Sequence, residues 1–446
     1  YLDSALLSDY IQFMVLAKHN DEVVATNSLT PTIAQRNSAI GYFEVPDPYY
    51  FGGYGGDAIA LSADGNTLVI GKSYDSSDAT GVNGDPNNSD ASDSGSVYIL
   101  TRTATGWQQQ AYIKASNTDS SDYFGESVSL SADGSTLAVS ARREDSNATG
   151  VNGDQDDNSA ENSGAVYIFT RTGTDWQQQA YIKASNTDSK DYFGAALSLS
   201  DNGNTLAIST NSEDSEATGI NGDQNDNSAT GSGAVYIYTR TGTDWQQMAY
   251  VKASNTDSSD LFGKSVSLSG NGRTLAVGAM YESSNTSGIN GEQHNNNAKK
   301  AGAVYVFSLS GLNWQQQAYI KASNTDAGDN FGISLSLNAN GNTLAIGADK
   351  EASDAIGVDG DQANNKADNS GAVYVFSRIG TNWDQQAYIK ASNTDVNSRF
   401  GDNFGNSVSL SDDGKTLAVG AQSEESDTTG VNGDQTNNNA NGSGAV

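Results

Sequence analysis

Apolar and polar residues alternate in short stretches along most of this chain, and the same stretches return many times. In the copy that begins at Phe124 the alternation predicts four strands, because a period of two is the pattern of a strand with one buried face. The expected strands are residues 127–131, 136–141, 165–170 and 176–183. The residues expected on one face of the last strand are Trp176, Gln178, Ala180 and Ile182.

Tryptophan residues mark the interval at which the pattern returns. Trp107 and Trp176 are 176 − 107 = 69 residues apart, and the same step leads to each later tryptophan. The later tryptophans are Trp245, Trp314 and Trp383. Phe-Gly pairs keep the same step, at Phe124, Phe193, Phe262 and Phe331. A period of this length indicates a repeat architecture, in which the units share one continuous fold.

The connections between the expected strands favour antiparallel pairing. Asp133-Gly134 lies between the first two strands, and Asp-Gly is a strong hairpin signal. Gly173-Thr174-Asp175 lies between the last two. Four antiparallel strands in each of several repeats describe the blades of an all-β propeller. A β-solenoid is the alternative, but its coils normally have a shorter period.

The repeats divide the chain into two regions. Residues 1–50 do not follow the repeat, and we expect strands at 10–17, 22–26 and 39–45, with a short helix as the alternative over the first. Residues 51–446 hold six copies, the last of which reaches Val446 inside its third strand. We predict seven blades, with the N-terminal strands closing the ring and so removing exposed sheet edges. Six blades is the alternative.

The order of short motifs in each copy resembles the FG-GAP repeat. One copy reads Phe262-Gly263, then residues 274–279 (TLAVGA), then residues 302–307 (GAVYVF). The family builds the seven-bladed propeller of integrin alpha subunits and occurs in bacterial surface proteins. The resemblance covers residues 51–446 and implies the fold more strongly than any function.

One feature of that family is missing. Its calcium loop, Asp-x-Asp-x-Asp-Gly-x-x-Asp, lies between the first two strands, where this chain has only residues 131–136 (SADGST). A single carboxylate in a tight turn cannot supply the six to eight oxygen ligands that calcium takes. The family's usual metal site is therefore not expected here.

The long loop between the second and third strands carries other candidate metal ligands. It spans residues 142–163 in the second copy, where Asn152, Asp154, Asp156 and Asn158 alternate as oxygen ligands do in calcium loops. Two positions are acidic in all six copies. They are Asp75 and Asp85, Glu144 and Asp154, Glu213 and Asp223, Glu282 and Glu292, Glu351 and Asp361, and Glu424 and Asp434. We expect these pairs to bind calcium; the alternative is that Asp and Asn cap the loop's own amides.

A second acidic pattern precedes each Phe-Gly pair. It recurs as Asp119 and Asp122, Asp188 and Asp191, Asp257 and Asp260, and Asp326 and Asp329. We expect these carboxylates to accept amide hydrogen bonds in the connection between blades. The tryptophans could stack on sugars, but we expect them to pack between adjacent blades, because large aromatic side chains mostly serve protein cores.

Composition argues against several classes of function. The net charge is 23 − 54 = −31, which repels nucleic acid and anionic membranes. There is no cysteine, and no apolar run approaches the length of a membrane-spanning helix, so we expect no direct membrane insertion. The two histidines, His19 and His294, do not recur with the repeat, whereas an active site needs one asymmetric group of residues. We therefore expect a protein that is not an enzyme.

These observations together favour a propeller at the cell surface or outside the cell. Its expected role is structural, adhesive or protein-binding, with calcium as a stabilising ion and a protein or glycan as the partner. A glycan-binding lectin is the first alternative, and a propeller-fold polysaccharide lyase or hydrolase is the second.

Overall fold

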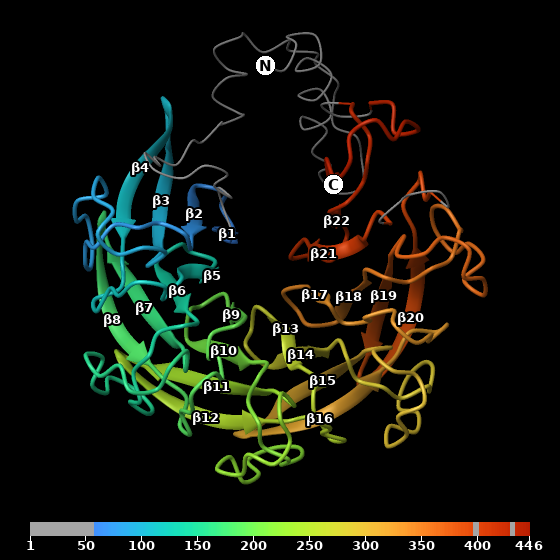
Figure 1. Cartoon of the computed structure of the whole chain (residues 1–446), viewed down its shortest axis with the longest axis horizontal. Helices are drawn as coiled ribbons and strands as arrows, with labels where there is room; N and C mark the ends of the chain where they lie inside the picture. The colour runs from blue at the N-terminus through green and yellow to red at the C-terminus, as the bar shows by residue number, and fades with distance from the viewer. Residues whose placement is uncertain (1–57, 396–400, 429–432) are drawn as a thin grey trace.

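The sheets of the molecule stand side by side in an arc around a central axis (Figure 1). This arrangement comes from a computed structural model that describes residues 58–395, 401–428 and 433–446. Within these ranges every regular element is a strand and there is no helix. Five sheets have four antiparallel strands and a sixth has two. This confirms the all-β propeller architecture predicted from the repeat.

Each sheet runs in chain order from the central axis outward (Figure 1). The innermost strands are β1 (Ala58–Leu61), β5 (Phe124–Leu130), β9 (Leu197–Leu199), β13 (Phe262–Leu268), β17 (Ser334–Leu337) and β21 (Phe404–Leu410). The second strands are β2 (Thr67–Lys72), β6 (Thr136–Ala141), β10 (Thr205–Thr210), β14 (Thr274–Ala279), β18 (Thr343–Ala348) and β22 (Leu417–Ala421). The third strands are β3 (Ser96–Thr103), β7 (Ala165–Thr172), β11 (Ala234–Thr241), β15 (Ala303–Ser310) and β19 (Ala372–Ile379). The outermost strands are β4 (Gly106–Ile113), β8 (Asp175–Ile182), β12 (Asp244–Val251), β16 (Asn313–Ile320) and β20 (Asn382–Ile389).

The predicted number of blades can be compared only with the described part of the chain. Six sheets are present there, one for each copy of the repeat. The strands expected at 10–17, 22–26 and 39–45 lie outside the described residues. The seventh blade, and the closing role of residues 1–50, therefore stay predictions.

The predicted alternation along the outermost strand is wrong in its second half. The register of β8 against β7 shifts between Ile168 and Phe169, so that Gln179 is an extra residue, a β-bulge. A bulge reverses which face the following residues occupy. Trp176 consequently packs toward the preceding blade, while Ala180 packs toward the next, together with Ile182.

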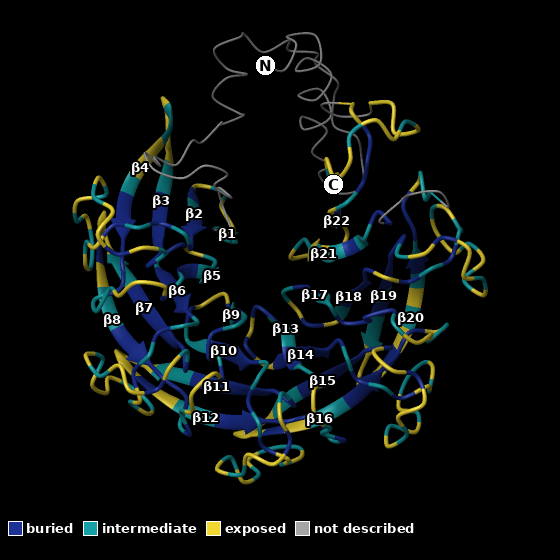
Figure 2. Cartoon of the chain, viewed as in Figure 1, coloured by how far each residue is buried: buried dark blue, intermediate teal, exposed yellow. Residues whose placement is uncertain are grey.

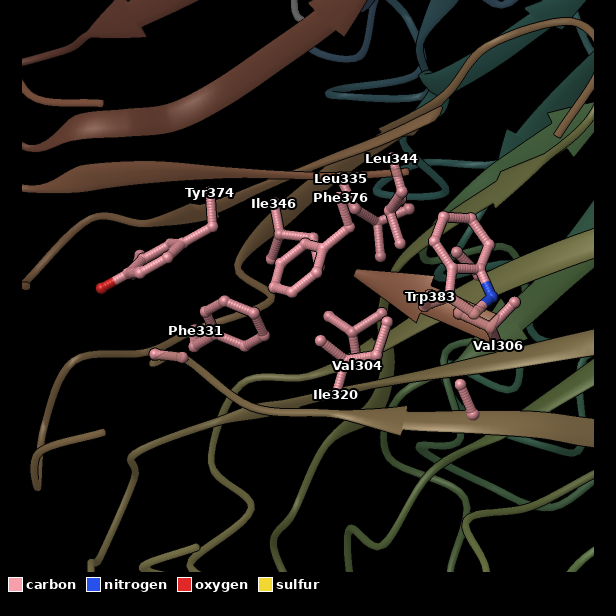
Figure 3. Packing of buried hydrophobic residues seen from close by; sticks show 14 of the residues in the cluster. Val304, Val306, Ile320, Phe331, Leu335, Leu344, Ile346, Tyr374, Phe376 and Trp383 are labelled. Atoms are coloured by element: carbon pink, nitrogen blue, oxygen red, sulfur yellow. The ribbon is translucent and has the colours of Figure 1, made fainter. Parts of the chain in front are cut away.

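The hydrophobic cores lie between adjacent sheets, and each is completed by one tryptophan. Figure 3 shows Phe331, Tyr374 and Trp383 from one blade against Val304 and Ile320 from the blade before it. The tryptophans in these cores are only 5–6% exposed, which confirms the expected packing role. They are Trp176, Trp245, Trp314 and Trp383.

The bulged glutamine gives the tryptophan a polar partner across the interface between blades. Trp245 Nε1 donates to Gln179 Oε1 at 3.0 Å, and Trp176 Nε1 donates to Gln110 Oε1 at 2.9 Å. Met248 stands at the equivalent place in the third blade, and the Nε1 atom of Trp314 is buried without a hydrogen-bond partner among the described residues. The methionine in place of glutamine thus explains why Trp314 Nε1 has no acceptor across the interface.

The Phe-Gly pair marks a close approach between the backbones of adjacent blades. Gly164 has a φ of 84°, and a Cβ there would lie 2.2 Å from the carbonyl oxygen of Phe193 in the next blade. Phe193 itself is fully buried. Only glycine allows both the positive φ and this close approach to the Phe193 carbonyl. The glycine before the third strand and the Phe-Gly pair therefore recur together, because they touch across the interface between blades.

The long loops project from the outer margin of the arc, and their tips are among the most exposed parts of each repeat (Figure 2). The second and third strands of the complete blades are mostly buried, because each of these sheets packs against its neighbours. No helix among the described residues is long and apolar enough to cross a membrane.

Candidate functional site

The long loop of each blade has a defined structure that is tied to the outermost strand. In the second blade, Asn152 N donates to the carbonyl oxygen of Tyr181 at 2.7 Å, and Tyr181 N returns a bond to Asn152 Oδ1 at 3.0 Å. Ser146 Oγ donates to the carbonyl oxygen of Asp154 at 2.6 Å, which holds the two arms of the loop together. Hydrogen bonds thus hold the long loop in a defined structure.

The first acidic position of the loop lies beneath it in a buried ion pair. Glu144 is 1% exposed, and Lys183 Nζ lies 2.8 Å from its Oε2. Tyr181 OH donates to Oε1 at 2.7 Å, Asn117 Nδ2 donates to Oε1 at 3.1 Å, and Ser146 N donates to Oε2 at 3.2 Å. Four donors therefore share the two carboxylate oxygens.

The same ion pair recurs in the neighbouring blades, and its members are as deeply buried in the next three copies. In the first blade the shorter Asp75 lies 3.5 Å from Lys114. The repeat thus buries one ammonium group beneath each of these loops. The three further pairs are Glu213–Lys252 at 2.8 Å, Glu282–Lys321 at 2.7 Å and Glu351–Lys390 at 2.7 Å.

Burial perturbs the groups of this network in a consistent direction. Loss of hydration lowers the pKa of Lys183 below its usual range, while the Glu144 carboxylate acts in the opposite direction. In the first blade, burial lowers the pKa of Lys114 to about 8. Burial and the nearby Glu144 charge raise the pKa of Tyr181 above its usual range, so its phenol remains a hydrogen-bond donor.

The second acidic position is exposed at the margin of the loop. Asp154 Oδ1 accepts a hydrogen bond from the amide of Asp156 at 3.1 Å, which is a local turn cap. The equivalent acids cap the residue two places further on in every other copy. They are Asp85, Asp223, Glu292, Asp361 and Asp434.

The two acidic positions are thus parts of one loop with separate roles. Among the described residues, no group of three or more His, Cys, Asp or Glu side chains is placed to hold a metal ion. The buried acids of the complete blades do not fit a calcium centre as arranged, because a lysine already supplies the compensating positive charge. The calcium assignment for all these residues stays a prediction, and the exposed acids are the members whose carboxylates reach solvent.

The second acidic pattern connects the blades, in agreement with its predicted structural role. Asp122 Oδ2 accepts the amide of Asp119 at 3.1 Å. The equivalent Asp329 Oδ2 accepts the amide of Asp326 at 3.0 Å. The outer carboxylate of the pair reaches the next loop, as in the 2.9 Å bond from Asn158 Nδ2 to Asp119 Oδ2.

Burial makes the inner carboxyl of this pattern a weak acid. It raises the pKa of Asp122, Asp191 and Asp260 to about 8. The Oδ2 atoms of Asp191 and Asp260 are buried and receive no hydrogen bond from the described residues. These carboxyls are therefore neutral over much of the acidic range, in which an exposed aspartate is charged.

Sequence reasoning missed the lysine and tyrosine that complete the ion-pair network. The signal was present, because the segment AYIKASNTD around Tyr181 and Lys183 recurs with little change. A lysine kept at one position in five copies of an acidic chain indicates a specific carboxylate partner. His294, in contrast, is an exposed loop residue whose amide donates to Glu292 Oε1 at 2.6 Å.

Comparisons with solved structures find distant likenesses. Hydrazine synthase from Kuenenia stuttgartiensis is 13% identical with a TM-score of 0.45, over 86% of this chain and 78% of that chain. A putative TolB from Agrobacterium tumefaciens is 11% identical with a TM-score of 0.37, over 83% of this chain and 91% of that chain. At this level the likeness bears on neither ligand nor activity. Among curated protein sequences no significant match is found.

The family model of the FG-GAP repeat matches three segments, at residues 107–169, 245–307 and 314–376. Each match begins at the tryptophan of one blade and ends in the third strand of the next. The repeat in sequence therefore spans the interface between two blades, which is where the tryptophan and the Phe-Gly pair make their contacts. The chain accordingly contains FG-GAP repeats at these three segments, and its sheets have the architecture of a β-propeller.

Proposed function

We propose that this protein acts outside the cell or at the cell surface, where it has a structural, adhesive or protein-binding role. The long loops on successive blades form its contact surface. The observation that carries this proposal is the repeated presentation of one exposed loop (Figure 2). In four of the blades a buried ion pair lies beneath this loop, with the Lys and Glu atoms 2.7–2.8 Å apart.

Repetition suits binding to an extended or repetitive partner. Linking equivalent sites raises the overall affinity because each later contact forms at a high effective concentration. The net charge of −31 supports a basic or neutral partner over nucleic acid or an anionic membrane. The buried anchors support loops that are ordered before they bind, which lowers the entropy cost of association.

The two alternative functions have less support. The core tryptophans are buried against the preceding blade, and three of them donate to a glutamine there, so they present no face to a sugar. The perturbed groups beneath the loops recur from blade to blade, whereas acid–base catalysis needs groups in distinct environments. A non-enzymatic role therefore has the stronger physical support.

The proposal also includes calcium, bound at the exposed acidic position of each loop that Asp154 represents. Their carboxylates reach solvent at the loop margin, where Asn152 and Asn158 are exposed as well. Carboxylate and amide oxygens are the ligands that calcium takes. The ion would offset part of the negative charge that the loops place at the outer margin.

Two measurements test the proposal. Protease accessibility on intact cells of the source organism should place the loops outside the cell, and a strictly intracellular protein would contradict the location. Binding of the purified protein should then be compared on a panel of purified surface proteins and on a glycan array. We expect saturable binding to a protein that weakens when Asp154, Asp223 and Asp361 are replaced together by serine. Binding confined to the glycan array would favour the lectin instead.

A further inference from the structure

A hollow of about 250 Å³ lies in the fourth blade, between the long loop that joins β14 to β15 and the connection from β12 to β13. We call it the fourth-blade hollow. Its lining residues are Asp257, Ser258, Ser259 and Asp260 of the connection, and Tyr281, Ser283, Asn296, Lys299 and Lys300 of the loop. Polar and charged side chains from two separate segments therefore converge on one small space.

Two adjacent lysines distinguish this hollow from the equivalent places in the other repeats. Lys299 and Lys300 stand where the other copies have neutral or acidic residues. The counterparts of Lys299 are Ser92, Glu161, Thr230, Asp368 and Asn441, and those of Lys300 are Asp93, Asn162, Gly231, Asn369 and Gly442. The pair gives the fourth-blade hollow a local positive charge in a chain whose net charge is −31.

The second blade has an ion pair at the place that Lys299 occupies in the fourth. There Glu161, the counterpart of Lys299, lies 3.4 Å from Lys190 of the preceding connection. In the fourth blade the residue that corresponds to Lys190 is Ser259. Among the described residues neither Lys299 nor Lys300 forms an ion pair. The described part of the chain therefore supplies no carboxylate partner for these lysines.

The fold holds both lysines in position. The carbonyl oxygen of Lys299 accepts the amide of Gly328 at 2.9 Å, and that of Lys300 accepts the amide of Asn330 at 3.1 Å. The Lys300 ammonium group lies 4.2 Å from the centre of the Tyr281 ring, which is a cation–π contact. The backbone of the pair is thus tied to the next blade connection, and one ammonium group is placed on an aromatic wall of the hollow.

The connection supplies hydrogen-bonding groups to the opposite wall. Burial raises the pKa of Asp260 to about 8, so near neutral pH this carboxyl is mostly uncharged and does not cancel the charge of the lysines. Asp257 Oδ2 accepts Asn296 Nδ2 at 3.0 Å, and a carboxylate has further lone pairs for hydroxyl donors. Ser258 and Ser259 are exposed and add two hydroxyl groups.

This combination matches the two functional parts of a hexuronic acid. The carboxylate of such a sugar can form charge-assisted hydrogen bonds with the ammonium groups of Lys299 and Lys300. Its ring hydroxyls can donate to Asp257 and exchange hydrogen bonds with the serines. An anion without hydroxyl groups would face the Asp257 carboxylate with nothing to donate to it. The chemistry of the hollow therefore favours an acidic sugar over a simple anion.

We propose that the fourth-blade hollow binds one hexuronate residue of an acidic glycan. Lys299 and Lys300 hold the sugar carboxylate, and Asp257 accepts its ring hydroxyls. This proposal is independent of protein binding by the long loops, because it uses none of the exposed acids represented by Asp154. Replacing Asp154, Asp223 and Asp361 by serine should consequently leave uronide binding unchanged.

Paired methyl glycosides are the direct probes of this site. Methyl glucuronide and methyl galacturonide differ from the corresponding neutral glucoside and galactoside only in having a carboxylate in place of a hydroxymethyl group. Saturation-transfer NMR titrations with the 446-residue protein should be run at physiological salt, where the Debye length of about 8 Å screens the distant acidic groups. We expect saturable binding of at least one uronide, with roughly tenfold weaker binding of its neutral counterpart.

Two substitutions test the charge of the hollow. Lys299→Gln should weaken uronide binding roughly tenfold and leave the affinity for the neutral glycoside unchanged. Ser259→Glu should have a similar effect, because it places an acid opposite Lys299. Ser259 and Lys190 have nearly the same φ, 69° and 71°, so this backbone position accepts a long side chain. Lys190→Gln is the matched control, because it removes an exposed lysine from the equivalent connection in another blade and should not change uronide binding.

Four results would overturn the proposal. The first is the absence of binding by either uronide, and the second is equal affinity for a uronide and its neutral counterpart. The third is an unchanged uronide affinity in Lys299→Gln. The fourth is binding of N-acetylglutamate as tightly as the uronide, which would mean that the hollow recognises a carboxylate without the sugar. Circular dichroism of each variant confirms that its fold is retained before affinities are compared.

Discussion

The buried ion pair beneath the third-blade loop offers a direct test of what holds these loops. Lys252 is fully buried and lies 2.8 Å from the carboxylate of Glu213, which is 1% exposed. Lys252→Met removes the ammonium group and leaves the carboxylate with Tyr250 OH, Asn186 Nδ2 and Ser215 N as donors. Breaking a buried pair by removing one partner costs about 3–5 kcal/mol, because an uncompensated charge stays buried. We therefore expect Lys252→Met to lose about that much stability.

The double change Glu213→Gln with Lys252→Met should recover most of that loss. With both charges gone, no uncompensated carboxylate remains, and a neutral amide can still accept from Tyr250. Replacing both members of a buried pair is often neutral or even stabilising. Recovery in the double variant would show that the single variant fails because of charge and not because of packing.

Urea unfolding followed by circular dichroism measures these changes. The midpoint and the slope are both needed, because a repeat protein can unfold in more than one step. Lys366→Met is the control, since Lys366 is 67% exposed and pairs with Asp354 at 3.1 Å. Exposed pairs contribute about 1 kcal/mol or less. Unfolding of Lys252→Met at the same urea concentration as Lys366→Met would refute the buried-charge explanation, and so would a double variant as unstable as the single one.

Three other predictions concern the core, pH and calcium. Trp245→Ala should destabilise the protein by roughly 3–5 kcal/mol in urea unfolding, since the ring is 6% exposed between two blades; an unfolding curve equal to the parent's would contradict the packing role. Burial raises the pKa of Asp191 in the folded state to about 8, above the ordinary value of 3.8. Between these two pH values the folded protein keeps a proton on Asp191 that the unfolded protein has lost. The free energy of unfolding should therefore fall as pH rises from about 4 to about 8. Asp191→Asn should raise the melting temperature at pH 8 and reduce this slope, and an unchanged slope in differential scanning calorimetry would speak against the assignment. Calcium bound at the exposed acids should raise the melting temperature more than magnesium does. The double change Asp223→Asn with Asp361→Asn should reduce the increase that calcium gives. A melting temperature that is the same in calcium and in chelator would exclude calcium as a stabiliser.

The repeat and most strands were readable from the sequence because they depend on local patterns. The alternation around Leu137 and Val139 predicts a strand at 136–141, and β6 has those bounds. Asp133-Gly134 predicts the hairpin, and Gly134 has the positive φ that such a turn needs. Both signals depend only on residues that are close together in the sequence, so they can be read without knowledge of the fold.

The candidate site was readable only in part, because its chemistry depends on partners far apart in the chain. Glu144 and Lys183 are 39 residues apart and meet only when the loop folds back over the outermost strand. In the sequence, both acidic positions of the long loop look like candidate metal ligands. Folding buries one beside a lysine and leaves the other at the loop margin.

Short segments of the chain are enough to establish the repeat length, most strands, the turns and the family resemblance. The face that each residue occupies, and the charges that become buried, follow only from the folded arrangement of the blades. The bulge at Gln179 is the clearest case: an extra residue in β8 turns Ala180 and Ile182 to the opposite interface, and it directs Gln179 to Trp245 of the next blade. Alternation along a strand carries no information about such a shift, because the shift is set by pairing with the neighbouring strand and by packing against the next sheet.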